Sequence, residues 1–176
     1  MISDKMYTSA GDLVSVTDET QNFYGDVIEV NDQPWPYFSV EPRKYRFRLY
    51  DMSMSRPFDL HIEISNGDWI DFQVIASDSG LFGAPVTTNN VILAMGERYE
   101  IVVDFSQYAG QSLTMKNTFT QEGVPQLGNT DLIMSFVVGN DVTDWSSNDV
   151  PSTLNPNIAW PKSKTTVDHS YRFEHG

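Results

Sequence analysis

The sequence has no cysteine in its 176 residues. No disulfide can form, no thiolate can serve as a nucleophile or metal ligand, and the compartment cannot be inferred from cysteine usage. Histidine is nearly as scarce, with only His61, His169 and His175, and no two of them form a His-x-His pair. Chemistry that needs clustered thiolates and imidazoles therefore has few donors in this chain.

Positive charge is also scarce, with 11 Lys and Arg against 24 Asp and Glu and a net charge of −13. Nucleic acids and anionic membranes require surface cations, so neither is an expected partner. No apolar run approaches the roughly 20 residues of a membrane span. The N-terminal MISDKMYTSAG lacks the apolar core of a signal peptide, and the sequence therefore leaves the localisation unknown.

What the chain does contain is a globular composition, with 40% hydrophobic and 12% aromatic residues. Short β-branched and aromatic runs alternate with turn residues about every ten residues, which is typical of an all-β Greek-key sandwich or barrel. The runs that predict strands are 27–30, 37–40, 44–50, 58–64, 72–77, 90–95, 99–105, 112–117 and 133–138, and the Gly- and Pro-rich SGLFGAP (79–85) predicts a loop.

The stretch KYRFR (44–48) alternates basic and aromatic residues. On a strand, this alternation gives one buried aromatic face and one solvated basic face. We prefer this interpretation to a basic binding patch, because the periodicity alone explains the pattern.

The character of the chain changes after Val138. We predict one β-domain over residues 1–140 with a truncated N-terminal strand, followed by a long irregular C-terminal extension. Residues 141–168 are rich in Pro, Ser, Thr and Asn and predict a linker. Residues 169–176 contain a strand-like fragment, which is expected to pack on a sheet edge. Both ends are expected to be cuts through a longer architecture.

Several residues have predicted structural roles in turns. Gly96 permits an unusual backbone conformation, and Arg98 is expected to bond a carboxylate or loop carbonyls at the entry to a strand, with substrate binding as the alternative. Pro34 and Pro36 fix the backbone around Trp35. The Trp35 ring is expected to plug the end of a sheet or, alternatively, to stack on a ligand.

The loop YDMSMSRP (50–57) places Met52 and Met54 close to Tyr50. Methionine adapts to irregular apolar shapes. We therefore expect these residues to contact a neighbouring domain or the core, or alternatively to line a small-molecule site.

No catalytic residue is predicted. The segment SDSG (77–80) lacks the Gly-x-Ser-x-Gly pattern of a nucleophile elbow, and nothing in the pattern brings Asp78 and Glu63 into one pocket. His61 lies in an alternating run and is interpreted as an ordinary strand histidine.

Four segments carry a family resemblance, in the order GDVIEVNDQPWPYFSVEPRKYRFRL, SRPFDL, FQVIASDSGLFGAPV and GERYEIVVDFSQYAGQSLTMKN. Together they resemble the second, middle cupredoxin domain of multicopper oxidases, in particular the fungal bilirubin oxidase group, which is also similar to bacterial laccases. The resemblance runs from about Lys5 to Val138. It continues through VPSTL and AWPKSK, which resemble the linker to a third domain, and HSYRFE resembles that domain's first strand.

The resemblance implies a cupredoxin-like fold and an oxidoreductase family. Such enzymes take electrons from phenols or pigments at a blue copper and pass them to a trinuclear copper cluster that reduces dioxygen to water. In the family, the copper ligands come from the first and third domains. A blue copper site needs a cysteine thiolate and two imidazoles, so we expect no copper, no metal site and no redox activity in this chain alone.

Two functions stay open at this stage. The chain is either a scaffold between copper-bearing domains, or a stand-alone domain that binds, or guides the conversion of, an apolar small molecule, for example in fungal secondary metabolism. The expected partners are neighbouring cupredoxin domains or a second copy of the chain, together with an aromatic or apolar small molecule in the second case.

Overall fold

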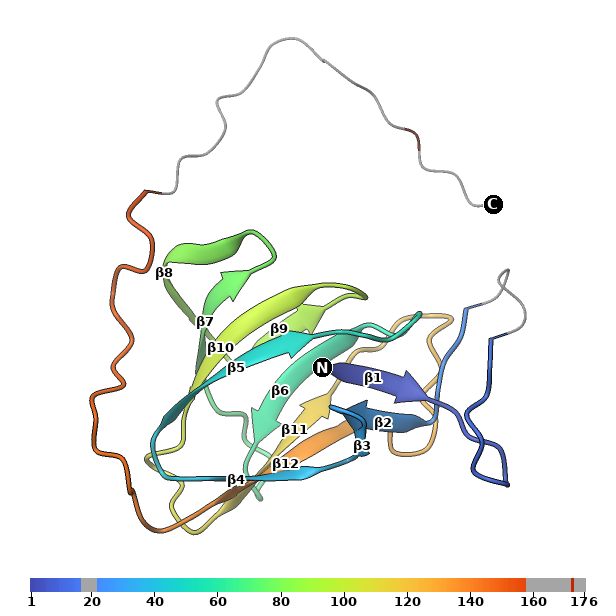
Figure 1. Cartoon of the computed structure of the whole chain (residues 1–176), viewed down its shortest axis with the longest axis horizontal. Coiled ribbons are helices and arrows are strands. Elements are labelled where there is room, and N and C mark those ends of the chain that lie inside the picture. The colour runs from blue at the N-terminus through green and yellow to red at the C-terminus, as the bar shows by residue number, and fades with distance from the viewer. Residues whose placement is uncertain (17–21, 158–171, 173–176) are drawn as a thin grey trace.

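The computed structural model describes residues 1–16, 22–157 and 172 of the chain. Every regular element in this part is a β-strand (Figure 1), as the all-β prediction requires. β-branched and aromatic side chains form these strands because they pack well on a pleated, half-buried surface. In chain order the strands are β1 (Ile2–Lys5), β2 (Val27–Val30), β3 (Gln33–Pro34), β4 (Tyr37–Val40), β5 (Lys44–Tyr50), β6 (Phe58–Glu63), β7 (Phe72–Ser77), β8 (Gly80–Thr88), β9 (Asn90–Leu93), β10 (Arg98–Asp104), β11 (Ser112–Asn117) and β12 (Leu132–Val138).

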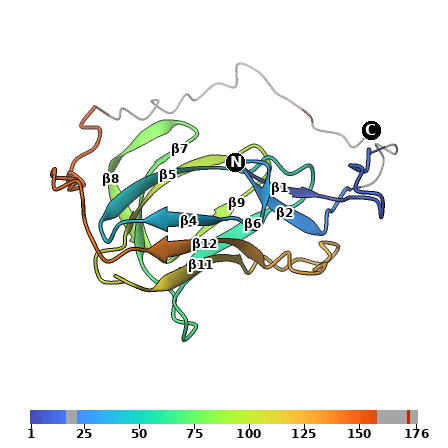
Figure 2. The same cartoon turned by 60° about the horizontal axis from the view of Figure 1, so that its bottom comes forward.

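Two large sheets form the domain, and a small third sheet adjoins them. The strand orders are β5-β10-β7-β8, β4-β12-β11-β6-β9 and β1-β2-β3. Figure 2 shows the two large sheets as separate layers, with β5 and β7 over β11 and β12. The chain passes repeatedly between these layers, as in a Greek-key sandwich. Within the described residues the sheets do not join into a closed barrel, so the sandwich form of the prediction is the one found. Nor does this part of the chain contain a helix long and apolar enough to cross a membrane.

The hydrophobic core lies between the two layers and follows the alternation of the strands. In β10, Ile101 and Val103 are fully buried. Glu100 lies on the opposite, outward face, where it pairs with Arg46 of β5. From β12, the buried Phe136 ring lies 5.4 Å from Phe47 and 5.2 Å from Phe105, measured between ring centroids. These aromatic contacts join the two sheets through side chains that are far apart in the sequence.

The alternation predicted for KYRFR is confirmed in β5. Tyr45 and Phe47 are partly buried against the core. On the opposite face, Arg46 and Arg48 both pair with Glu100 of the adjacent strand β10. The basic side chains therefore complement a neighbouring carboxylate on the outer face of the sheet.

The loop prediction for SGLFGAP was wrong, because most of this segment belongs to β8. β8 is the edge strand of its sheet, a position in which Pro85 is tolerated since no further strand needs its missing N–H. Val74 pairs with Val86 while Ala76 pairs with Leu81, so the register shifts between these pairs as in a β-bulge. Glycine and proline signal a turn in a local sequence pattern, and for that reason the segment was predicted as a loop.

The described part of the predicted linker, residues 141–157, lies against the sandwich and is called the strap below. It runs from the end of β12 towards β8 (Figure 1). The strap is held by ion pairs of Arg43 with Asp144 at 2.8 Å and of Lys44 with Asp149 at 3.2 Å. Residues 158–168 and the predicted strand fragment 169–176, apart from position 172, lie outside the described residues.

The aromatic contacts across the core predict the effect of truncating Phe136. Phe136→Ala is expected to lower the free energy of unfolding by about 3–5 kcal/mol, because it removes buried surface and leaves a cavity between the sheets. Chemical denaturation of the purified chain measures this loss. The neighbouring exposed Val137 provides the control, since Val137→Ala should stay within about 0.5 kcal/mol. Equal losses in the two variants would contradict this account of the core.

Candidate functional site

Two loops meet at one end of the sandwich, residues 51–57 after β5 and residues 94–97 before β10. The Asp51 N–H donates to the Glu97 carbonyl at 3.2 Å, and the Gly96 N–H donates to the Asp51 carbonyl at 3.0 Å. Gly96 has a φ of 80°, in the left-handed region where a side chain is strained. The predicted turn glycine therefore lies in a turn that backbone hydrogen bonds fix to the neighbouring loop.

Arg98 connects three segments at this end of the molecule. Its Nε lies 2.8 Å from Asp78 Oδ1, and its Nη1 donates to the Gly96 carbonyl at 3.0 Å. The guanidinium carbon lies 5.7 Å from the centre of the Tyr50 ring. Tyr50, Gly96 and Arg98, which the sequence singled out separately, are thus brought together. Because Arg98 is more than half exposed, its ion pair contributes only about 0–1 kcal/mol.

The two methionines of the 51–57 loop have different surroundings. The Met52 N–H donates to the Ile2 carbonyl at 2.7 Å and joins the loop to β1, while its side chain is exposed. Met54 lines a groove of about 260 Å³ together with Met95 and Tyr24. That Met52 and Met54 contact a neighbouring domain or a small molecule stays a prediction. Met95, which the sequence did not single out, lines the same groove as Met54.

Trp35 makes its contacts at the small sheet. It has a φ of 40°, directly after Pro34 of β3. Its N–H donates to the Ile28 carbonyl at 3.1 Å, and its indole Nε1 donates to the Asn129 carbonyl at 3.2 Å. Trp35 therefore ties the small sheet to the loop before β12. Pro36, by contrast, lines an apolar pocket of about 340 Å³ between β4, β5 and β12.

A buried ion pair that the sequence did not predict joins four segments of the chain. The side chains of Arg56 and Asp4 have no exposed surface, and Nε lies 3.0 Å from Oδ2. Arg56 also donates to the carbonyls of Pro125 at 2.9 Å and Gly25 at 3.0 Å, and the Gly25 N–H donates to Asp4 Oδ2 at 2.7 Å. The partners are 52 residues apart, and no signal in a single sequence pairs them.

The Asp51 side chain is fully buried close to this ion pair. Its Oδ1 accepts the Ser53 N–H at 2.7 Å, whereas its Oδ2 has no hydrogen-bond partner in the part of the chain that the structure describes. Burial raises the pKa of Asp51 to about 7; the charges of Asp4 and Glu97 add to the rise, and the hydrogen bonds from Ser53 oppose it. Near neutral pH, this carboxyl group therefore exchanges a proton.

His61 lies on the outward face of β6, where Trp69 covers it. The two rings stack with their centroids 3.8 Å apart. His61 Nε2 lies 3.5 Å from Glu63 Oε2, and Glu63 also pairs with Lys116. Burial lowers the pKa of His61, and the hydrogen bond to Glu63 opposes that effect. These contacts are those of a packed side chain on a strand.

The copper sites implied by the resemblance need donors that this chain does not provide. The sequence has no cysteine and three histidines, whereas a blue copper site takes a thiolate and two imidazoles. Over residues 1–16, 22–157 and 172, no group of three or more His, Cys, Asp or Glu side chains is placed to hold a metal. His169 and His175 lie outside these ranges. The donor set does not fit the copper centres, and no step of copper chemistry is assigned to this chain.

The sandwich is similar to solved structures of multicopper oxidases, which share its cupredoxin-like architecture. The multicopper oxidase McoA of Aquifex aeolicus matches with a TM-score of 0.77 and 32% sequence identity, over 88% of this chain and 33% of that chain. A second structure, the 2F4 variant of the same protein, matches with a TM-score of 0.78.

Sequence relatives lie in the same class. The chain is 42% identical over 181 residues to the bilirubin oxidase of Albifimbria verrucaria, covering 98% of this chain and 31% of the relative. It is 44% identical over 96 residues to the laccase of Bacillus subtilis (strain 168), covering 54% of this chain and 18% of that protein. The chain is therefore homologous to part of the bilirubin oxidase and laccase multicopper oxidases, and it spans less than a third of the length of these relatives. No family model matches the chain.

The buried ion pair predicts a large cost for removing one partner. Arg56→Ala is expected to lower the free energy of unfolding by about 3–5 kcal/mol, because it leaves the Asp4 carboxylate buried without its counter-charge. Denaturant unfolding monitored by fluorescence measures the change. Arg98→Ala removes an exposed arginine and should cost about 1 kcal/mol or less. If the two substitutions cost the same, the buried pair does not have the structural role assigned to it.

The raised pKa of Asp51 predicts a pH dependence of stability. Because the folded state holds this proton up to a pKa of about 7, against 3.8 for the ordinary group, the contribution is fully present below pH 3.8 and is lost as the pH rises to about 7. Asp51→Asn keeps the shape of the side chain and removes the titration. Its unfolding free energy, measured relative to the wild-type chain from pH 4 to 8, should therefore rise with pH. Parallel curves for the two proteins would show that Asp51 does not titrate in this window.

Proposed function

We propose that this chain is the middle, copper-free cupredoxin-like domain of a fungal multicopper oxidase of the bilirubin oxidase and laccase type. In this role it is a scaffold that joins and orients copper-bearing domains of an enzyme that oxidises phenolic or pigment substrates with dioxygen. One observation carries the proposal. The chain is 42% identical to a bilirubin oxidase over 98% of its own length, yet its sequence lacks the cysteine that a blue copper site requires.

The outer face of the five-stranded sheet supports a scaffold role. Trp69, Ile92 and Val137 are all exposed there, beside the packed His61. The same face carries the ion pair of Glu63 and Lys116, so it offers both apolar and charged contacts, and we propose that it is buried against another protein surface. Neighbouring cupredoxin domains, or a second copy of the chain, are the proposed partners for this face.

A chimera tests the scaffold role directly. In the bilirubin oxidase of Albifimbria verrucaria, the segment homologous to this chain is replaced by the chain itself. The chimera is expected to keep blue absorbance and dioxygen consumption, because the family resemblance implies that the copper donors lie in the retained parts. A chimera with Phe136→Ala in the inserted segment is the control for stability. A folded chimera that binds copper normally but has lost activity would contradict the proposal that the domain orients the others.

Metal analysis of the isolated chain is the second arm of this test. After incubation with copper and gel filtration, the chain should retain no stoichiometric, blue-absorbing metal, because it has no thiolate to supply the absorbance. Tightly held blue copper would overturn the scaffold proposal. The mass of the chain in solution, measured in the same sample, distinguishes a monomer from a pair of copies.

The alternative function, a stand-alone domain that binds or converts an apolar small molecule, has no support from the comparisons. The relatives named above are a bilirubin oxidase and a laccase, and the solved structures are multicopper oxidases. A pocket of this domain can bind a ligand whether the domain is a scaffold within a larger enzyme or stands alone.

A further inference from the structure

The outer face of the four-stranded sheet is mostly charged. Glu100 pairs there with Arg46 and Arg48, and Arg98 pairs with Asp78. Alternation along the strands predicts this, because the other face of the same sheet supplies the core. Apolar side chains on this outward face therefore require a separate explanation.

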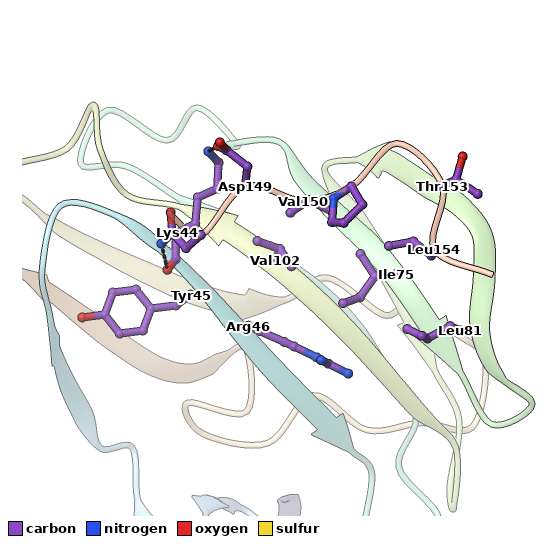
Figure 3. A pocket seen from close by; sticks show the side chains of 12 residues that line it. Lys44, Tyr45, Arg46, Ile75, Leu81, Val102, Asp149, Val150, Thr153 and Leu154 are labelled. Carbon is purple, nitrogen blue, oxygen red and sulfur yellow. Dashed lines mark hydrogen bonds and ion pairs between the residues drawn. The ribbon is translucent and has the colours of Figure 1, made fainter. Parts of the chain in front are cut away.

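Two such side chains are Ile75 of β7 and Val102 of β10. They are only 5% and 8% exposed, but neither belongs to the core cluster between the sheets. Leu81 of β8 and Val150 and Leu154 of the strap line the same place. Figure 3 shows these five apolar side chains converging from two neighbouring strands, the edge strand and the strap.

The strap covers this apolar strip without filling the space above it. A pocket of about 360 Å³ lies between the strap and the sheet, within the range of about 300–1,000 Å³ typical of small-molecule sites. The strap is fixed on both sides of the pocket. Asn148 Nδ2 donates to the Lys44 carbonyl at 2.9 Å, and the Leu154 N–H donates to the Gly83 carbonyl at 2.9 Å. The pocket is partly open to solvent, so a small molecule can enter it without displacement of the strap.

The charged groups of the pocket already have partners. Lys44 Nζ lies 3.2 Å from Asp149 and 3.8 Å from Asp104. Arg46 Nε donates to Glu100 at 2.6 Å. An anionic ligand would have to compete with these carboxylates in a chain of net charge −13, and a cationic one would meet the two basic groups of the lining. The balance of charge thus favours a neutral ligand.

We propose that the pocket between the strap and the four-stranded sheet is a binding site for a neutral, apolar small molecule, aromatic or branched aliphatic. Ile75 and Val102 form its floor, Leu81 forms a side wall, and Val150 and Leu154 cover it. The site uses residues of this chain alone and does not depend on the proposed scaffold function.

The uncharged fluorescent probe N-phenyl-1-naphthylamine tests the site in the whole chain. Its emission should rise saturably at one probe per chain. Leu81 is partly exposed in the free chain, so Leu81→Glu should leave the fold intact, yet it should weaken binding at least about tenfold because an apolar ligand against the side wall would bury the unpaired carboxylate. Val86→Glu is the matched control, since Val86 is an exposed residue of the same strand outside the lining, and it should leave the affinity unchanged.

A strap variant distinguishes loss of the site from damage to the edge strand. Val150→Asp lies outside both sheets and should also weaken binding at least about tenfold, with an unchanged unfolding midpoint. If Leu81→Glu and Val86→Glu both lose binding, Val150→Asp decides: a tenfold loss supports the site, and wild-type affinity overturns it. Absence of saturable binding to the wild-type chain, or equal binding by all the variants, overturns the proposal as well.

Discussion

The contact between Arg56 and Asp4 is the constraint on which the loop end of the sandwich depends. The guanidinium and the carboxylate have no exposed surface, so each depends on its charged partner rather than on water, although Asp4 Oδ1 has no hydrogen-bond partner within the described residues. Arg56 also donates through Nη1 to the Pro125 carbonyl and through Nη2 to the Gly25 carbonyl. The position of the 51–57 loop is thereby fixed relative to β1, and the loop in turn holds the turn at Gly96.

That constraint also explains the behaviour expected of Asp51. Its carboxyl group is enclosed by the same loop and feels the charge of Asp4. A second ionised carboxylate there would face both the cost of burial and the repulsion of its neighbour. The arrangement is therefore one charge pair plus one carboxyl group whose pKa is raised to about 7.

Most strands were predictable from the sequence because a half-buried strand alternates apolar and polar residues, and this alternation is visible in the sequence. In β5, basic and apolar residues alternate from Lys44 to Leu49, so each residue of this run indicates the face on which it lies, whereas in β10 the apolar Val102 interrupts the alternation between Ile101 and Val103. β8 was missed because glycine and Pro85 signal a turn locally, whereas their tolerance depends on the strand being an edge, which is a property of the whole sheet. Likewise, Gly96 and Arg98 were predictable as turn residues, but their meeting with Tyr50 follows from the register of β5 and β10, in which Arg98 lies opposite Tyr50. Pairs such as Arg56 with Asp4 depend on tertiary contacts that single-sequence patterns do not contain.

The strap illustrates how composition and contact diverge. Residues 141–157 have the composition of a linker, yet Asp144 and Asp149 meet the basic start of β5. Exposed ion pairs of this kind contribute little each and weaken with salt, so they orient the strap more than they hold it down. The hydrogen bonds of Asn148 and Leu154 and the burial of Val150 and Leu154 above Ile75 and Val102 then contribute to the attachment. A pocket remains between the strap and the sheet. An apolar ligand in this pocket would contact the sheet and the strap together. The strength with which the strap is held therefore depends on whether the pocket is occupied.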